Sequence, residues 1–444
     1  MKIAVIGSGI AGLAAAWLLR RDHDVVVFEK NARLGGHTNT QYVDDPAGPL
    51  AIDTGFIVHN DRNYPRLLAL FDLLGIKTQP SDMSFSASIN AGAVEYAGDA
   101  LFAQPSNLVS PSHWRMLSDI VRFNRLGKDA LATNSCQGQS LGAWLDQHRF
   151  SEAFVWRYLL PMAASIWSSP SQSVRDFSAP ALLEFFNNHG LLDLKNRPNW
   201  RTVVGGTTRY VERIESDLAR SIHTNRAIRS VRRRPDGVAL TDRGGHEMVF
   251  EGVVFASHAD ETLKMLEDPD AAEIALLGAF QYRANQAFLH SDVRLMPKRR
   301  RAWASWNYLT QQADEACEVS ISYWMNRLQR LDAQKEYLVT LNPLVEPHPS
   351  EVHYQTEYTH PVFNQATRKA QASMGHLQGH RNCWYCGAWM GYGFHEDGLG
   401  AAVEVVSSLG VELPDAIDQA RAHPAPYTKN FEPWSGPGSH LIHG

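Results

Sequence analysis

The stretch that decides the fold is residues 3–12, IAVIGSGIAG, close to the beginning of the chain. Its first four residues are apolar and predict a buried strand, and the alanine-rich run that follows predicts a helix. The first glycine permits a sharp turn, the second lets the backbone approach a pyrophosphate, and the third allows close packing of helix and strand. N–H groups at the start of such a helix face a negative charge. Dinucleotide contacts are therefore expected from Gly7, Gly9, Ile10, Ala11 and Gly12.

A second strand is predicted at residues 25–29, VVVFE, and it ends in an acidic residue. Glu29 follows the glycine turn by about 20 residues, the distance at which a carboxylate accepts a hydrogen bond from an adenosine ribose hydroxyl. A carboxylate here also repels a 2′-phosphate, so NADP is disfavoured.

A second pair of glycines follows in residues 30–38, KNARLGGHT. This pair offers another backbone surface close to phosphates, and an arginine can present a fixed fork of donors to them. The alternative is a solvated arginine before a flexible turn. The expected cofactor contacts in this loop are Lys30, Arg33, Gly35 and Gly36.

The order G-x-G-x-x-G, then Glu29, then R-x-G-G from Arg33 resembles the signature of the flavin amine oxidase, protoporphyrinogen oxidase and phytoene desaturase superfamily. The resemblance implies an α/β fold in which a Rossmann-like FAD-binding domain of the amine oxidase type is interleaved with an α+β substrate domain. FAD is the implied cofactor. It is expected to be non-covalent, because Cys386 does not lie in the sequence setting of the cysteine that some amine oxidases link to FAD.

The resemblance extends along the chain to a bacterial branch of the superfamily, through residues 53–60, 301–308, 323–329 and 384–398. Members of this branch are often associated with enzymes that methylate or cyclopropanate unsaturated fatty acyl chains. The resemblance thus implies a hydrophobic, lipid-like substrate and a lipid-modifying enzyme as a partner.

Composition limits the function classes. The chain has 444 residues, 44% hydrophobic, and a net charge of −5, which argues against nucleic acid as a partner. No apolar run is long enough to span a membrane, and no signal peptide is expected because the first strand begins at Lys2. The 4 cysteines are too few for a disulfide framework, so a cytoplasmic location is expected, with peripheral contact at the inner face of the membrane as a further expectation.

The FAD-binding domain is expected in separated pieces. Two further contacts with the cofactor are expected at Thr54 and Gly55, and the resemblance places Ala227 and Ile228 beside the adenosine. The predicted segments are 1–90, 201–285 and 376–421 for the FAD-binding domain, 91–200 and 286–375 for the substrate domain, and 422–444 for a tail.

The last predicted cofactor segment is a buried strand, a glycine turn and a helix that begins near Gly398. The positive end of such a helix would point towards the flavin. The superfamily usually has an acidic residue after the glycine that corresponds to Gly387, whereas this chain has Ala388. The expected contacts are Gly387, Asp397, Gly398 and Leu399.

The same region contains a competing metal-binding pattern, H-x3-H-x2-C-x2-C, from His376 to Cys386. Zinc accepts such ligands. However, Cys383 and Cys386 would point to opposite faces of a regular strand, because side chains alternate along it. We therefore predict no metal site.

A second G-x-G-x-x-G with an acidic strand end is absent from the sequence, so no separate NAD(P)H domain is expected. The flavin would then take electrons from an organic substrate, by hydride removal from a C–C or C–N bond, or assist an isomerisation. For the proton transfer, His395, Glu396 and Tyr392 are candidates close to the flavin. Alternatively, the first two only cap the following helix.

Aromatic residues in the two substrate segments predict an apolar pocket, with core packing as the alternative. The pocket candidates are Ile166, Trp167, Trp303, Trp306, Tyr308, Tyr323 and Trp324. A basic cluster at 298–301 is expected either to touch anionic lipid headgroups or to be a solvated loop. The leading hypothesis is an FAD-dependent desaturase of an acyl lipid. An amine oxidase, a lipid isomerase and a non-catalytic flavoprotein partner remain alternatives.

Overall fold

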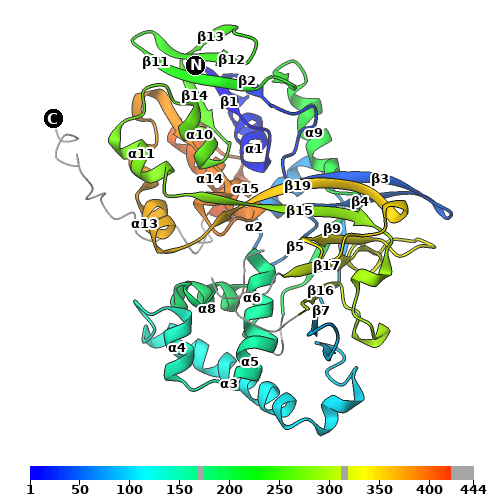
Figure 1. Ribbon diagram of the computed structural model, residues 1–444. Helices are drawn as coiled ribbons and strands as arrows, with labels where there is room; N and C mark the ends of the chain where they lie inside the picture. Colours follow the sequence, from blue (N-terminus) through cyan, green and yellow to red (C-terminus); the bar gives the residue numbers. More distant parts are fainter. Residues whose placement is uncertain (168–173, 194, 196, 312–318, 422–444) are drawn as a thin grey trace.

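The protein was analysed as a computed structural model, which describes residues 1–167, 174–193, 195, 197–311 and 319–421 (Figure 1). The predicted tail therefore lies outside the described residues. No helix among the described residues is long and apolar enough to cross a membrane.

A five-stranded parallel sheet forms the centre of the nucleotide-binding part, in the order β10-β2-β1-β14-β20. The glycine turn joins β1 to the first helix, and Ile6 in β1 pairs with Phe28 and Phe255 of its neighbours. The strands are β1 (Lys2–Ile6), β2 (Asp24–Phe28), β10 (Ile222–His223), β14 (Gly252–Phe255) and β20 (Cys383–Tyr385).

Helices cover one face of this sheet. All residues of α1 are buried there, because the helix packs between the sheet and α14. The helices of this layer are α1 (Ile10–Leu19), α2 (Pro65–Leu74), α9 (Thr208–Leu218), α14 (His395–Ser408) and α15 (Asp415–Arg421). The predicted late helix thus begins at His395, three residues before Gly398.

The other face of the sheet is covered by a three-stranded antiparallel sheet and short helices. These are β11 (Ile228–Arg234), β12 (Gly237–Asp242), β13 (Glu247–Phe250), α10 (Ala259–Met265), α11 (Ala271–Leu277) and α13 (Gln365–Ser373). Side chains of the central strands alternate between the two cores: Cys383 lies in this one, and Cys386 in the core on the α1 side. The alternation expected for these two cysteines is therefore observed.

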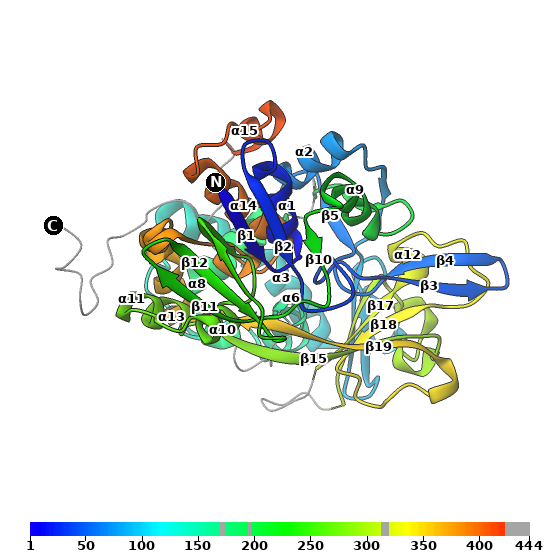
Figure 2. The same ribbon diagram turned by 90° about the horizontal axis from the view of Figure 1, so that it is seen from above.

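The substrate part contains a seven-stranded mixed sheet, in the order β19-β15-β18-β17-β16-β7-β8. Its two longest strands, β15 and β19, extend from beneath the nucleotide-binding part into this sheet (Figures 1 and 2). The strands are β7 (Phe85–Ile89), β8 (Val94–Ala97), β15 (Gln281–His290), β16 (Trp306–Leu309), β17 (Ser320–Trp324), β18 (Leu338–Leu341) and β19 (Val352–Val362).

The segment boundary predicted at residue 90 falls inside the β7–β8 hairpin, where Ile89 pairs with Val94. The turn has positive φ at Asn90, Ala91 and Gly92, and turn residues of this kind resemble a boundary in the sequence. Two small sheets connect the parts: β3 (Thr40–Asp45) pairs with β4 (Gly48–Asp53), and β9 (Trp200–Val203) lies between β5 (Val58–Asn60) and β6 (Thr78–Pro80).

Helices complete the substrate part, at the bottom of Figure 1. They are α3 (Pro111–Thr133), α4 (Leu141–Gln147), α5 (Glu152–Phe154), α6 (Leu160–Trp167) and α8 (Ala179–Asn188). A π-helical turn at Val155–Leu159 joins α5 to α6, and the Tyr96 hydroxyl donates to the carbonyl of Arg157 within it, at 2.5 Å. Turns of this type are frequent at functional sites.

Candidate functional site

The opening glycine turn leaves space for a ligand at one position only. A Cβ atom on Gly7 would lie 2.8 Å from the carbonyl oxygen of Ala256, and one on Gly12 would lie 1.9 Å from the carbonyl oxygen of Gly7. A Cβ on Gly9 would meet no atom within 4 Å. Gly9 is the N-cap of α1, and no side chain caps that helix end. The exposed N–H groups therefore face an open space of the kind that a pyrophosphate fills.

Glu29 lies at the end of β2 beside this turn and is buried. Its carboxylate accepts hydrogen bonds from the Ser8 N–H at 3.1 Å, the Ser8 hydroxyl at 2.6 Å and the Asn31 N–H at 2.8 Å. These bonds fix its orientation. The Arg226 N–H donates to the Glu29 carbonyl oxygen at 2.8 Å, which places the chain at Ala227 next to this strand end.

Ile228, the other residue expected beside the adenosine, has its side chain in the core on the β11 side of the central sheet. The structure therefore brings the predicted ribose and adenosine residues to one edge of the sheet.

The second glycine pair touches the first turn. A Cβ on Gly36 would lie 3.1 Å from the Cα of Gly9, and both Gly35 and Gly36 have positive φ. The Arg33 guanidinium donates to the carbonyl oxygens of Leu34, Gly36 and Thr38, so it holds the shape of this loop. Its direct contact with phosphates stays a prediction.

Lys30, another expected cofactor contact, forms an ion pair with Glu261 at 2.6 Å. Both side chains are substantially exposed, so this pair contributes little to stability.

Asp53 connects three distant segments. Its carboxylate accepts hydrogen bonds from the Thr207 N–H at 2.9 Å, the Thr40 hydroxyl at 2.5 Å and the Gln329 side-chain amide at 2.9 Å. Burial raises its pKa to about 6. The next residue, Thr54, donates to the Asn39 carbonyl oxygen. The Asp53 turn is therefore an anchor between the nucleotide-binding and substrate parts.

Three histidines that the sequence analysis did not select lie where these parts meet. The His37 ring stacks on Tyr358 at 5.0 Å and lies 5.3 Å from the His360 ring, and His258 stacks on Tyr282 at 4.2 Å. Burial lowers the pKa of all three, and that of His360 falls to about 4.

These imidazoles are therefore neutral near pH 7. The Nε2 atom of His37 is buried and has no hydrogen-bond partner in the described part of the chain. His37 directly follows Gly36, and a Cβ on Gly55 would lie 2.1 Å from its carbonyl oxygen. Its position immediately after R-x-G-G is the signal by which the sequence analysis could have found it.

The late helix meets the early one at their N-termini. A Cβ on Gly398 would lie 3.0 Å from Cγ2 of Ile10, so α14 begins against the first turn of α1. The Asp397 carboxylate accepts hydrogen bonds from the N–H groups of Tyr392, at 3.0 Å, and Phe394, at 2.8 Å. Leu399 is completely buried in the core. Two positive helix ends thus converge, an arrangement suited to an anionic cofactor.

The remaining glycine of this segment, Gly387, lies in the turn that follows β20. A Cβ there would lie 2.4 Å from Nε1 of Trp389, so this close approach requires glycine.

His395 was predicted to transfer protons, but its ring is enclosed. Nε2 lies 3.0 Å from the Thr38 hydroxyl and 3.2 Å from the Tyr210 hydroxyl, and the ring stacks on Phe56 at 3.6 Å. Burial lowers its pKa to about 3. The neutral ring therefore joins the R-x-G-G loop, α9 and α14, and its proton-transfer role stays a prediction.

Glu396, the second candidate for proton transfer, is held against α2, and its catalytic role stays a prediction. Its carboxylate accepts hydrogen bonds from the Arg66 N–H at 3.0 Å and the Leu67 N–H at 2.9 Å, and it lies 3.3 Å from Nη1 of Arg66. Burial outweighs Arg66 and raises its pKa to about 7. Glu396 therefore caps α2. Helix capping was the alternative, but the helix capped is α2 instead of its own.

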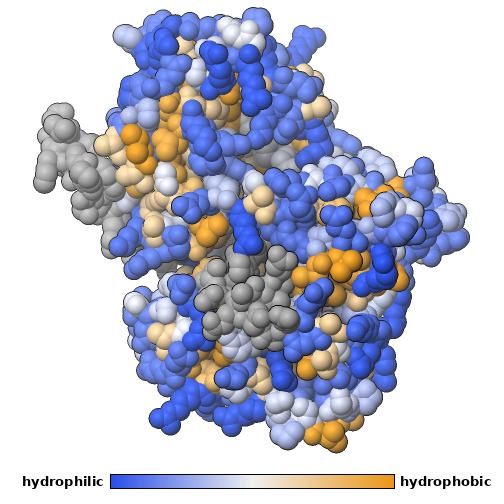
Figure 3. Space-filling model, viewed as in Figure 1, coloured by the Kyte–Doolittle hydropathy of each residue, from blue (hydrophilic) through white to orange (hydrophobic). Residues whose placement is uncertain are grey.

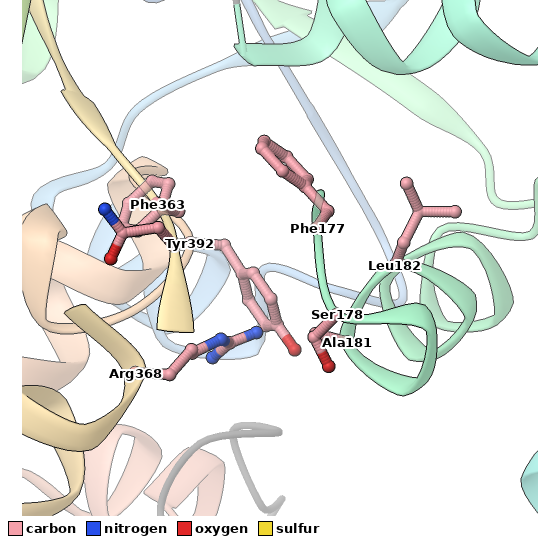
Figure 4. Close-up of a pocket in the computed structure, with 8 residues that line it drawn as sticks. Phe177, Ser178, Ala181, Leu182, Phe363, Arg368 and Tyr392 are labelled. Atoms are coloured by element: carbon pink, nitrogen blue, oxygen red, sulfur yellow. The ribbon is translucent and has the colours of Figure 1, made fainter. Parts of the chain in front are cut away.

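Tyr392 lines a pocket between the two parts of the molecule (Figure 4). The Arg368 guanidinium lies over its ring at 4.3 Å, and burial raises the pKa of the tyrosine to about 12. Side chains from the α8 region form one wall of the pocket, and side chains from the α13 region and the glycine turn form the other. The lining residues are Phe177, Ser178, Ala181, Leu182, Phe363, Asn364, Arg368 and Tyr392.

Where their side chains are described, the residues predicted for the apolar pocket lie in two separate core clusters. Trp306 and Tyr308 share a core cluster with Tyr392, and Ile166 and Tyr323 pack against that cluster. The buried Nε1 of Trp306 has no partner among the described residues. The side chain of Trp167 lies outside the described part of the chain.

Trp303 and Trp324 form a separate cluster with Met296 and Leu338, and the two rings meet edge to face at 5.4 Å. They therefore do not share the cluster around Tyr392, and their place in a substrate pocket stays a prediction. Trp303 precedes β16 and Trp324 ends β17, so sequence proximity to Trp306 did not place them in the same cluster.

A family model described as flavin containing amine oxidoreductase matches residues 10–331. A Mycobacterium tuberculosis protein named as a flavin-containing monoamine oxidase, AofH, is 29% identical over 264 residues. That match covers 56% of this chain and 56% of the relative, so it spans little more than half of either protein.

Solved structures share the fold. Putrescine oxidase bound to putrescine has a TM-score of 0.64 at 16% identity and covers 93% of this chain and 100% of its own. A fatty acid isomerase from P. acnes that produces CLA has a TM-score of 0.63 at 16% identity, with 91% and 98% covered.

Proposed function

Because the chain belongs to the flavin containing amine oxidoreductase family, whose cofactor is FAD, we propose that this flavoenzyme desaturates a hydrophobic fatty acyl substrate. Two neighbouring carbons of the acyl chain each lose a hydrogen, one as a hydride and one as a proton, and a C=C bond forms. The bound flavin supplies the acceptor for the hydride. A base or water takes the proton, and dioxygen or another electron acceptor completes the cycle.

The observation that carries this proposal is the chemistry of the pocket beside Tyr392. Most of its lining is apolar, Arg368 is the cation in it, and none of the 8 lining residues is a carboxylate. Glu184 acts electrostatically on Tyr392 from α8 but does not line the pocket. A positive charge in an apolar pocket repels an ammonium ion and attracts a carboxylate or phosphate. The pocket therefore favours an acyl lipid over a charged amine.

The nucleotide side of the site is consistent with the same reaction. The two converging helix ends and the open space at Gly9 suit the pyrophosphate of FAD, and the unpartnered Nε2 of His37 offers a polar contact nearby. The neutral histidines leave this region without the extra positive charge that their protonation would add. These residues would hold and orient the cofactor, while the aromatic cluster around Trp306 excludes water from the substrate.

Amine oxidation is the second candidate. It is supported by the sequence similarity to AofH and by the fold shared with putrescine oxidase. An amine would have to enter in its neutral form, because Arg368 disfavours the ammonium ion. A lipid isomerase is the third candidate, and the fold shared with the fatty acid isomerase supports it.

Anaerobic incubation of the purified flavoprotein with a total lipid extract tests the proposal. The expected result is a loss of oxidised-flavin absorbance together with one lipid whose mass falls by two hydrogens. Release of hydrogen peroxide with polyamines or aryl amines, and no reaction with lipid, would contradict it in favour of amine oxidation. A moved double bond without net electron transfer would support the isomerase. Tight co-purification of a lipid enzyme, without turnover of any lipid or amine, would support a non-catalytic partner.

A further inference from the structure

An apolar surface is exposed at the end of the helical part that is farthest from the nucleotide site. It comprises Leu108, Val109 and Trp114, and we call it the apolar tip. Their exposed fractions are 53%, 82% and 51%. The first two lie in a 3-10 turn at Pro105–Val109 that leads into α3, and the Trp114 indole donates to the Leu108 carbonyl oxygen at 2.9 Å. Figure 3 shows hydrophobic colouring at the lower end of the molecule, where α3 begins in Figure 1.

The basic cluster at 298–301 lies beside the apolar tip, because both are fixed to the buried carboxylate residue Glu95. The side-chain amide of Asn107, in the 3-10 turn, donates to the Glu95 carbonyl oxygen at 2.9 Å. The Glu95 carboxylate accepts from the Lys298 N–H at 2.7 Å and from the Arg299 side chain at 2.8 Å. Two segments about 200 positions apart in the chain are therefore packed against the same buried residue.

The four basic residues of this cluster have different surroundings. Arg299 is paired with Glu95, and Arg300 is paired with Glu336 and lies over the Trp303 ring at 3.9 Å. Lys298 and Arg301 are exposed and form no ion pair with any described residue. The latter two are the charges available to a partner.

The two stretches of sequence that form this region carry no acidic residue. Residues 100–118, which include the whole tip, contain no aspartate or glutamate, and residues 293–301 contain only basic charges. Arg115, one residue after Trp114, has a largely exposed side chain that pairs with the buried Asp119 at 3.6 Å. The protein as a whole is negative, with a net charge of −5. Exposed tryptophan and leucine beside lysine and arginine are typical of surfaces that bind at the boundary between lipid headgroups and acyl chains.

We propose that the apolar tip docks the protein on the surface of a bilayer that contains anionic lipids. Leu108, Val109 and Trp114 enter the headgroup region, and Lys298 and Arg301 lie against the phosphates. The tryptophan ring suits this position because one edge is polar and its body is apolar. This docking does not require that the bound lipid be the substrate, so it can be tested independently of the desaturase proposal.

Co-sedimentation of the flavin-loaded protein with vesicles tests the docking. The vesicles are phosphatidylcholine alone or phosphatidylcholine with phosphatidylglycerol, at low and at high salt. The wild type is expected to bind only the vesicles with phosphatidylglycerol, and binding should weaken as salt screens the charges. The double variant Leu108→Asp/Val109→Asp should bind at least tenfold more weakly.

The matched control is Ile274→Asp on α11, in the nucleotide-binding part, where the isoleucine is 52% exposed and therefore comparable to Leu108. It should bind like the wild type. Lys298→Glu/Arg301→Glu should lose the preference for phosphatidylglycerol. Equal binding by the double variant and the wild type, equal loss in the control, or no binding of the wild type to either vesicle overturns the proposal. Flavin content and turnover of detergent-dispersed lipid, measured in parallel, report on the enzyme independently.

Discussion

The nucleotide side and the substrate side of the site are built in different ways. On the nucleotide side, the decisive contacts come from glycines near the start of the chain, such as Gly9 and Gly36, whose backbones touch each other. On the substrate side, the pocket is assembled from α8, the start of α13 and the turn at Tyr392, which are far apart in the chain. A pyrophosphate is the same in every dinucleotide, so it is recognised by a short backbone motif. A variable substrate is recognised by side chains that only the fold brings together.

The same contrast separates neighbouring residues at the start of α14. Asp397 stabilises the turn before the helix, His395 faces the R-x-G-G loop, and Glu396 faces α2. Residue type and their place near the flavin segment marked the last two as acid–base candidates. Their hydrogen bonds show that both also connect α14 to other elements, and their proton-transfer roles stay predictions.

The largest effect is expected at Gly9, where the absence of a side chain leaves space for the cofactor. Gly9→Trp should abolish FAD retention while the flavin-free protein stays folded, because a Cβ at Gly9 meets no protein atom within 4 Å. Gly12→Ala is the contrasting variant: its Cβ would lie 1.9 Å from a carbonyl oxygen, so folding itself should fail. Flavin-to-protein ratio and circular dichroism distinguish the two. A fully flavinated Gly9→Trp protein would show that the pyrophosphate lies elsewhere.

The next effect tests whether Glu396 belongs to the framework. At pH 8, where the Glu396 carboxyl with its pKa of about 7 is mostly ionised, Glu396→Gln leaves Arg66 buried without its counter-charge and should lower the free energy of unfolding by about 3 kcal/mol. The loss should appear in flavin-free and flavin-loaded protein alike, in urea denaturation. The control is Glu404→Gln on the same helix, whose pair with Arg421 is partly exposed and should matter by less than about 1 kcal/mol. Unchanged stability with lost turnover would instead make Glu396 a catalytic residue.

A smaller effect is expected on the substrate side. Arg368→Leu should raise the KM for a lipid with an anionic end by about tenfold, the equivalent of about 1.4 kcal/mol, with little change in kcat. Arg368→Lys should retain part of the affinity because it keeps the charge. Steady-state kinetics with an anionic and an uncharged acyl substrate provide the comparison. An equal change for both substrates would mean that Arg368 only supports the Tyr392 ring.

The smallest effect concerns the buried histidines. Burial lowers the pKa of His395 to about 3 and that of His59, His189, His290 and His360 to about 4. Their unfolded pKa is about 6.5, so the unfolded chain binds protons first as the pH falls. The contribution of these histidines to the free energy of unfolding is therefore greatest above pH 6.5 and should decrease as the pH falls below it.

His395→Asn should reduce this slope by about 1.4 kcal/mol per pH unit in that range, whatever it does to stability at pH 8. Urea denaturation at several pH values measures the slope. The pH profile of the turnover rate should show no titration of His395 between pH 5 and 8. A titration in this range that disappears in the variant would identify His395 as a catalytic group.

The sequence predicted the nucleotide side well because its information is local. The parallel sheet, the glycine turn, the acidic end of β2 and the late helix all follow from motifs and hydrophobic patterns in short windows. The opposite orientations of Cys383 and Cys386 follow from strand alternation. His37 was missed although it adjoins a motif, since nothing in the sequence shows that its ring meets Tyr358 and His360 of β19.

The substrate side was predicted only in part. Trp303 and Trp306 are three residues apart, yet they lie in different clusters, because the first precedes a strand and the second begins it. Arg368 carries no motif and acquires its significance from Tyr392, which follows it by more than 20 positions. Pairings of this kind depend on tertiary structure and leave no local pattern.

The desaturation proposal can be tested by an anaerobic reductive titration, in which FAD absorbance is followed as either a phospholipid with unsaturated acyl chains or putrescine is added. We expect the phospholipid to bleach the flavin and to become two hydrogens lighter, while the amine leaves the spectrum unchanged. Bleaching by putrescine, with no response to the phospholipid, would contradict it.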